Sequence, residues 1–207
     1  MENQIILEHV NKFYGKKQAL KDINLTIGQG MFGLLGRNGA GKSTLMKILA
    51  TLHEKQSGSI TVCGIPIEEA KEIRSIIGYL PQDFSMYPFM TTEEALHYLG
   101  MLSEIPKGER RERIDSLLEK VHLSEERHKK IRSLSGGMKR RLGIAQALLH
   151  DPRVLIVDEP TAGLDPEERI RFRNLLCEVA EARIVILSTH IVGDIEASCE
   201  NLAVLNE

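Results

Sequence analysis

The chain has 207 residues, of which 42% are hydrophobic and 27% are charged, and its formal net charge at pH 7 is −2. This is an ordinary composition for a soluble globular protein, long enough for one large domain or for a core domain with a small appended subdomain. The nearly balanced charge argues against a surface built to bind nucleic acid or an anionic membrane.

Cysteine usage and hydropathy point to an intracellular protein. Cys63, Cys177 and Cys199 are widely spaced and form no C-x-x-C pair, so we expect reduced core residues rather than metal ligands or a redox pair. The N-terminus lacks the basic region of a signal peptide, and no apolar run approaches the ~18–20 residues that cross a bilayer. A role at a membrane would therefore need a second chain to supply the spanning part.

The first thirty residues predict an antiparallel β layer. Apolar and polar residues roughly alternate over 5–10 and 23–27, with turns predicted at 14–15 and 28–30. Tyr14 is an aromatic residue next to a glycine at the edge of this layer. It either packs within the protein or lies against a purine base, and we favour the purine.

A glycine-rich loop follows an apolar strand at 32–35 and precedes a helix, and it has the pattern G-x-x-x-x-G-K-[ST] of a phosphate site. Backbone N–H groups must turn inward around an anion, and we expect a side chain at Gly39 or Gly41 to occupy that space. Lys42 supplies a charge for the outer phosphates, and the Ser43 hydroxyl is suited to Mg²⁺. The predicted nucleotide-binding loop consists of Gly36, Arg37, Asn38, Gly39, Ala40, Gly41, Lys42, Ser43 and Thr44.

Beyond this loop the sequence predicts a strand over 59–62, a helix over 68–75 and a strand over 76–80, separated by turns at 56–58 and 64–66. Pro81 and Gln82 end the last strand. The next segment, 83–90, holds three aromatic residues and two methionines without periodicity. We expect it either to pack beneath the following helices or, preferably, to face a partner.

The middle of the chain is predicted to be helical, over 92–101 and 107–121. The basic residues between 127 and 141 are balanced by acidic residues elsewhere, so no nucleic-acid partner is expected. Ser135, Gly136 and Gly137 precede a helix that runs to about residue 149. A serine and two glycines at a helix start form a second possible anion site.

Two buried strands are predicted in the last third, at 154–157 and 183–187, because both are continuously apolar. Asp158 and Glu159 follow the first strand and His190 follows the second, with a helix from about Asp165 to residue 181 between them. Ligands of open α/β sheets bind at the carboxyl ends of parallel strands. We therefore expect both carboxylates and His190 beside the phosphates, and the two carboxylates to point in different directions.

Together these motifs resemble the nucleotide-binding subunit of an ABC transporter, and the resemblance covers essentially the whole chain. The phosphate loop alone is shared by many NTPases. The segment Leu134-Ser135-Gly136-Gly137-Met138 shortly before Asp158 and Glu159, with Gln82 and His190 in the expected order, is far more specific. The pattern around Gln82 looks most like the ATPase subunits of export systems whose membrane part is another polypeptide.

The resemblance implies an α/β fold of the P-loop NTPase (RecA-like) type, with a mainly parallel sheet, the N-terminal antiparallel β layer and an inserted helical subdomain at about 84–150. It implies one ABC ATPase domain over 1–207. Family members usually continue past a strand like that at 202–205, so we also expect a C-terminal end shortened relative to the family, with an exposed sheet edge.

The resemblance also implies two copies that enclose two ATP molecules head to tail, as a homodimer or heterodimer of cassettes. It implies catalytic roles for Glu159 as general base and for Lys42, His190 and Gln82. The implied Mg²⁺ ligands are Ser43, Gln82 and Asp158. The implied ATP contacts are Tyr14 on adenine, the 36–44 loop on the phosphates, Ser135, Gly136 and Gly137 on the partner's γ-phosphate, and Asp165 across the dimer interface.

The predicted function is ATP hydrolysis that powers transport through a separate transmembrane permease, at the cytoplasmic face of the cell membrane. One alternative is an ABC ATPase acting on ribosomes or DNA, although neither a second cassette nor a long coiled coil is visible. A P-loop small-molecule kinase would not need residues 134–138. A module that binds nucleotide without turnover would tolerate the loss of Glu159, which is present.

Overall fold

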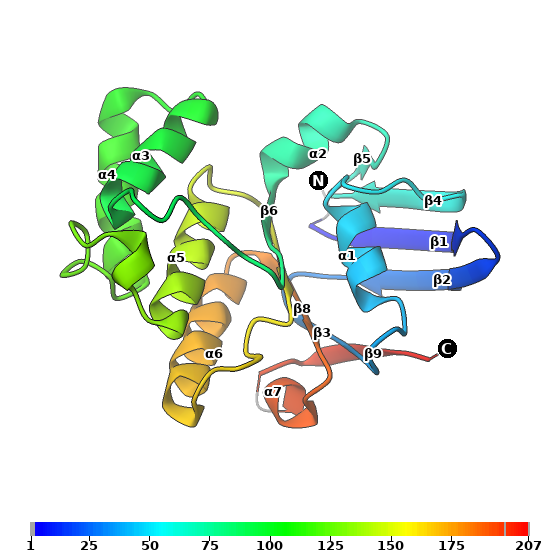
Figure 1. The fold of residues 1–207 in the computed structure, drawn as a ribbon. Helices are drawn as coiled ribbons and strands as arrows, with labels where there is room; N and C mark the ends of the chain where they lie inside the picture. The colour runs from blue at the N-terminus through cyan, green and yellow to red at the C-terminus, as the bar shows by residue number, and fades with distance from the viewer. Residues whose placement is uncertain (1–2, 197, 207) are drawn as a thin grey trace.

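The computed structural model describes residues 3–196 and 198–206. Its N-terminal part is a four-stranded antiparallel sheet in the order β2-β1-β4-β5 (Figure 1). The predicted β layer is thereby confirmed, although its strands are longer than expected and it recruits two strands that follow the phosphate loop. The strands are β1 (Ile5–Tyr14), β2 (Lys17–Ile27), β4 (Ser57–Val62) and β5 (Ile65–Pro66).

The second sheet forms the centre of the molecule and is parallel throughout, in the order β6-β7-β8-β3-β9. Every residue of β7 and β8 is buried, as the continuous apolar runs predicted. The carboxyl ends of β3, β7 and β8 lie at one edge of the sheet, where the site is built. The strands are β3 (Gly30–Gly36), β6 (Ile77–Leu80), β7 (Val154–Asp158), β8 (Ile184–Thr189) and β9 (Asn201–Leu205).

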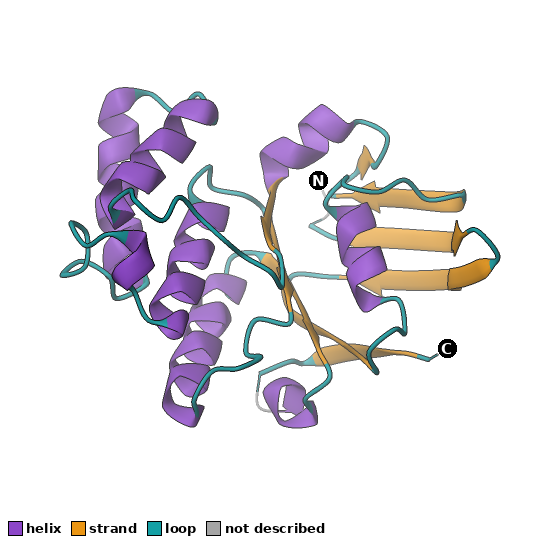
Figure 2. Cartoon of the chain, in the orientation of Figure 1, coloured by secondary structure: helices purple, strands orange, loops and turns teal. Residues whose placement is uncertain are grey.

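The central sheet separates two apolar cores, with helices α3 to α6 on one side and α1 and the antiparallel sheet on the other (Figures 1 and 2). One core joins α1 and the antiparallel sheet to the central sheet, and the other joins it to the helices α3 to α6. The helices are α1 (Lys42–Leu49), α2 (Ala70–Ile76), α3 (Thr92–Leu102), α4 (Lys107–Lys120), α5 (Gly136–Leu148), α6 (Pro166–Ala180) and α7 (Val192–Glu196), with a 3₁₀ turn at Ile131–Ser133.

Side-chain caps fix the starts of three helices. Thr91 forms a reciprocal capping box with Glu94 at α3, and the Ser135 and Asp165 side chains accept backbone N–H groups of α5 and α6. These starts agree with the sequence prediction. Four small expectations were wrong: Tyr14 ends β1 rather than forming a turn, residues 57–58 begin β4 rather than forming a turn, Ile65–Pro66 is a short strand, and α2 covers 70–76 rather than 68–75. Neither α7 nor the 3₁₀ turn was expected, because a single turn carries little periodicity.

The loop over 83–90 packs in part beneath the helices, one of the two alternatives that the sequence left open, and exposes two of its aromatic residues. Phe84, Met86 and Met90 pack against the helical core, whereas Tyr87 is 44% exposed and Phe89 is 70% exposed. All three cysteines are free as expected; Cys63 is buried, and the half-buried Cys177 and Cys199 pack against the edge of the helical core. Within the described chain, no helix has the length and hydrophobicity needed to cross a membrane.

Three of the basic residues between 127 and 141 have acidic partners in the fold. Arg127 forms ion pairs with Glu93 and Asp115, Lys129 pairs with Glu126, and the buried Arg141 pairs with Glu168 of α6. Part of this positive charge is therefore neutralised within the molecule. At the other end of the chain, β9 lies at the edge of the central sheet, with Leu202 and Val204 each 52% exposed.

Candidate functional site

The glycine-rich loop connects β3 to α1, and the N-terminus of α1 points its backbone N–H groups into the site. Gly41 caps this helix in the left-handed conformation with φ 96°, and the described structure gives the cap no side-chain hydrogen bond. The first N–H groups of a helix need partners, and the positive end of the helix dipole favours an anion there. The loop is therefore suited to bind phosphate.

Close approach to neighbouring strands gives a further reason for glycine at two positions of this loop. A Cβ at Gly41 would lie 2.4 Å from the Ala19 carbonyl oxygen on β2, and the positive φ adds strain. Gly39 has φ 93°. A Cβ at Gly36 would lie 2.8 Å from the Leu205 carbonyl oxygen on β9. At Gly36 and Gly41, the glycines let the loop lie close to neighbouring strands.

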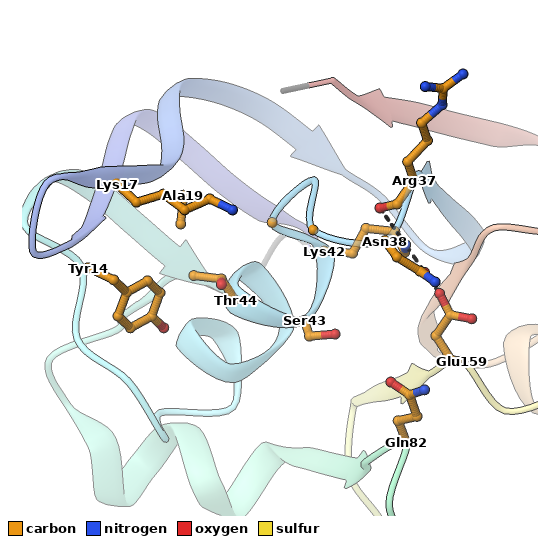
Figure 3. A pocket seen from close by; sticks show the side chains of 12 residues that line it. Tyr14, Lys17, Ala19, Arg37, Asn38, Lys42, Ser43, Thr44, Gln82 and Glu159 are labelled. Carbon is orange, nitrogen blue, oxygen red and sulfur yellow. Dashed lines mark hydrogen bonds and ion pairs between the residues drawn. The ribbon is translucent and has the colours of Figure 1, made fainter.

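Lys42, Glu159 and His190 form a linked cluster at the loop (Figure 3 shows the first two). Lys42 Nζ lies 3.1 Å from Glu159 Oε1 and donates to the Gly36 carbonyl oxygen at 2.7 Å. His190 Nδ1 lies 2.6 Å from Glu159 Oε2. An ionised carboxylate only accepts hydrogen bonds, so Nδ1 of His190 carries the proton. Glu159 and His190 therefore lie together beside the loop, at the strand ends where the sequence placed them.

Ser188 of β8 orients both carboxylate residues, and sequence reasoning missed it. Its hydroxyl donates to Asp158 Oδ1, while the backbone N–H of Glu159 donates to the Ser188 carbonyl oxygen and hydroxyl, each at 3.1 Å. Glu159 has φ 49°, a left-handed conformation that costs energy in a residue with a Cβ. This turn directs Glu159 toward Lys42 and leaves Asp158 on the sheet.

Asp158, Ser43 and Gln82 have side-chain oxygens suited to a Mg²⁺ ion that is held mainly by phosphate and water. Asp158 is 2% exposed and has one oxygen bonded to Ser188, and the Ser43 hydroxyl lines the same cavity as Gln82. Mg²⁺ commonly uses one or two protein oxygens together with substrate phosphates. Among the described residues, no group of three or more His, Cys, Asp or Glu could hold a metal.

The hydroxyl of Tyr79 is a further polar group suited to this Mg²⁺ site. The β6 register places Tyr79 beside Ile156, two residues before Asp158 and on the same face of the sheet. Its hydroxyl is buried and has no hydrogen-bond partner among the described residues. Burial and the nearby Asp158 charge raise the pKa of Tyr79 to about 12, so it is a phenol at neutral pH. A buried donor without a partner next to a buried carboxylate is suited to a metal-bound water.

The cavity at the loop has a volume of about 340 Å³ (Figure 3). Its wall on the β-layer side includes Tyr14, which is 47% exposed and is contacted by His53 at a ring-centroid distance of 6.1 Å and by Lys12 at 5.3 Å. Lys17 and Ala19 of β2 also line it, and the sequence gave no signal for either. The lining residues are Tyr14, Lys17, Ala19, Arg37, Asn38, Gly39, Gly41, Lys42, Ser43, Thr44, Gln82 and Glu159.

A second group of expected site residues lies outside this cavity. Ser135 and Asp165 are exposed and use their side chains as helix caps. A Cβ at Gly136 would meet nothing within 4 Å, whereas a Cβ at Gly137 would lie 2.4 Å from Glu168 Oε2. The structure of one chain therefore does not bring Ser135, Gly136, Gly137 or Asp165 to the loop, and Gly136 leaves open space above the start of α5.

Comparisons with known proteins agree with this architecture. A family model described as ABC transporter matches residues 20–162. The linearmycin resistance ATP-binding protein LnrL of Bacillus subtilis is 38% identical over 203 residues, which cover 97% of this chain and 65% of that protein. The Nod factor export ATP-binding protein I of Cupriavidus pinatubonensis is also 38% identical over 203 residues, covering 97% of this chain and 62% of that protein.

Among solved structures, cbiO1 of Clostridium perfringens, described as part of the ABC transporter complex cbiONQ, superposes with a TM-score of 0.91 at 31% identity. The superposition covers 100% of this chain and 86% of cbiO1. A dimeric bacterial ABC transporter cassette superposes with a TM-score of 0.85 at 29% identity, covering 97% of this chain and 94% of that chain. The expected P-loop NTPase fold is confirmed. The chain spans less than two thirds of the length of the first curated relatives, from 54% to 66%.

Proposed function

The chain belongs to the ABC transporter family of ATP-binding proteins, and we propose that it binds and hydrolyses MgATP to drive export through a separate membrane permease. The observation that carries this proposal is the buried Glu159 carboxylate, held between Lys42 and His190 at the phosphate loop. A module that only binds nucleotide would not need a carboxylate in that position. The names of two relatives, one conferring linearmycin resistance and one exporting Nod factor, support the direction of transport.

The proposed chemistry follows from charge and position. Lys42 and the N–H groups of α1 bind the phosphate oxygens and neutralise the charge of the transferred phosphoryl group. Ser43, Asp158 and Gln82 would hold Mg²⁺, which would neutralise further charge on the phosphates. Once Lys42 binds phosphate, Glu159 loses an ionic partner and can accept a proton from the attacking water. His190 holds Glu159 in place and lies where it can contact the γ-phosphate.

The nucleotide base is proposed to lie on Tyr14. Its ring is partly exposed toward the cavity and is braced by His53 and by Lys12, whose ammonium also donates to the Glu54 carbonyl oxygen at 2.5 Å. A fixed aromatic ring provides a stacking surface for a purine.

A second copy of the cassette, identical or homologous, is proposed to complete the site. We propose an anion-binding site, or seat, at the start of α5, formed by the exposed Ser135 and the open Gly136. The phosphate loop of the same chain does not reach it. In the proposed head-to-tail dimer, this seat binds the γ-phosphate held by the partner's loop, and Asp165 lies at the same interface. The dimeric cassette among the solved structures supports this arrangement.

The permease is proposed to contact the exposed apolar residues near the helical part of the molecule. Phe89 is 70% exposed, Leu102 63% and Met101 57%. Phe84 and Met86 line a nearby cavity of about 340 Å³. Such contacts would hold the chain at the cytoplasmic face of the membrane, with no nucleic acid involved.

The proposed activity is tested by measuring phosphate release from ATP by the purified chain, with Mg²⁺ and with EDTA. We expect hydrolysis that depends on Mg²⁺. If the chain bound MgATP tightly but released no phosphate at any protein concentration, a module that binds nucleotide without hydrolysing it would be the better-supported function. Transfer of phosphate to a small-molecule acceptor, instead of water, would favour a kinase.

A further inference from the structure

Arg140 connects the helix that carries the exposed serine-glycine turn to the backbone of Gln82. Its Nη1 donates to the Gln82 carbonyl oxygen at 2.5 Å and reaches the Pro81 carbonyl oxygen at 3.5 Å. Gln82 follows β6, and its side chain lines the phosphate-loop cavity beside Glu159 (Figure 3). The guanidinium therefore contacts the backbone of a residue whose side chain faces the reacting groups.

The same helix packs tightly against the chain on both sides of Gln82. A Cβ at Gly143 would lie 2.6 Å from Leu80 Cδ1 and 3.2 Å from Phe84 Cδ1, and a Cβ at Gly78 would lie 2.1 Å from the Ala147 carbonyl oxygen. There is thus little room for α5 to move without moving β6 and the following loop. Close packing transmits such displacements because protein interiors deform little.

The distance between the two functional ends of this connection is short. Ser135 caps α5 and Arg140 lies five residues later. At a rise of about 1.5 Å per residue, the two residues are separated by roughly 7.5 Å along the helix axis. Arg140 is half-buried, and its hydrogen bond to the backbone of the exposed Gln82 lies at the surface of the protein.

We propose that Arg140 is a positioning residue that fixes Gln82 relative to the Ser135–Gly137 turn. A partner molecule that engages this turn in one chain then sets the position of Gln82 in the site of the same chain. The inference rests on the proposed function, because Gln82 matters only if the cavity hydrolyses nucleotide. It assigns Arg140 no contact with nucleotide.

The test compares Arg140→Met, which keeps the side-chain volume without the donors, with Arg140→Lys, which keeps a charged donor. Arg173→Met of α6 is the matched control, because it removes a half-buried arginine that makes no hydrogen bond to the Gln82 loop within the described chain. For Arg140→Met we expect kcat to fall roughly tenfold, the usual effect of losing a hydrogen bond to a charged group. KM for ATP and the melting temperature should stay close to wild type, and Arg140→Lys should recover most of kcat.

A spectroscopic arm makes the result independent of turnover. The chain has no tryptophan, so Tyr87→Trp places a single reporter in the exposed part of the loop that follows Gln82. MgATP should change its emission, and Arg140→Met should abolish the change while ATP still binds. Wild-type protein without ATPase activity would refute the proposed function, yet this arm would still test Arg140.

Two results would overturn the inference. One is wild-type kcat together with a wild-type emission change in Arg140→Met. The other is a loss of melting temperature and ATP affinity that Arg140→Lys does not restore, because that pattern belongs to a residue needed only for folding.

Discussion

The Lys42 ammonium and the Glu159 carboxylate form a buried ion pair, with 3.1 Å between Nζ and Oε1 and with each residue 5% exposed. Burying two charges costs solvation energy, and their attraction offsets this cost only while both are present. A nucleotide phosphate can replace Glu159 as the partner of Lys42. The pair thereby links phosphate binding to the release of a carboxylate that can act as a base.

Glu159→Gln should keep MgATP affinity and slow hydrolysis by roughly 10²–10⁴-fold, because the amide cannot take a proton from water. Phosphate release and binding of a fluorescent ATP analogue measure the two effects separately. Glu112→Gln, on the exposed surface of α4, is the matched control. Near wild-type turnover in Glu159→Gln would remove Glu159 from the role of general base.

Ser135→Arg should abolish ATPase activity and leave nucleotide binding by the monomer intact, since an arginine would block the seat at the start of α5. Wild-type specific activity should also rise with protein concentration in dilute samples. Ser116→Arg on the exposed side of α4 controls for the added charge. The dimer would be refuted by full, strictly proportional activity in a sample that sedimentation shows to be monomeric.

Tyr79→Phe should leave the melting temperature of the protein alone unchanged or slightly higher, because it removes a buried hydroxyl that has no partner among the described residues. The additional stabilisation by MgATP should become smaller by about 1 kcal/mol if the hydroxyl binds a water of the metal site. Thermal unfolding with ATP, in Mg²⁺ or in EDTA, measures this. Tyr98→Phe serves as control, and an unaltered MgATP shift in Tyr79→Phe would rule out that role.

Because of the buried His150, we expect the free energy of unfolding to fall at acidic pH. Burial lowers its pKa below the ordinary value, although its hydrogen bond to the Ile77 carbonyl oxygen at 3.1 Å partly opposes this. The unfolded chain then binds a proton near pH 6.5 that the folded chain does not, so the free energy of unfolding should fall as pH drops from about 6.5 toward the lowered pKa. Denaturant unfolding at several pH values should show a flatter dependence for His150→Gln than for wild type or the exposed His128→Gln. Equal slopes would contradict the assignment.

Local sequence patterns predicted most of the fold, because the hydrophobic pattern and the capping residues of these segments favour the same helices and strands that the structure contains. The apolar runs at 154–157 and 183–187 became the buried strands β7 and β8, and Asp165 caps α6 as a serine or aspartate before a proline should. Because ligands bind at the carboxyl ends of parallel strands, the proximity of Glu159 and His190 could be predicted without any knowledge of the loops between them.

The residues that the sequence did not reveal act through tertiary contacts. Ser188 became important because β8 pairs with β7 in a register that places it beside Asp158. Lys17 lines the cavity because β2 pairs with the end of β1 at Tyr14. A serine at a strand end or a lysine near a hairpin has no distinctive pattern, so neither could be selected before the strand order and register were known.

The central claim, that the loop holding Lys42 binds the terminal phosphates of a nucleotide for hydrolysis, is tested most directly by Lys42→Met. MgATP affinity from equilibrium binding and turnover from phosphate release should both fall sharply. Lys47→Met, on the same helix, should behave like wild type. Wild-type affinity and turnover in Lys42→Met would contradict the account.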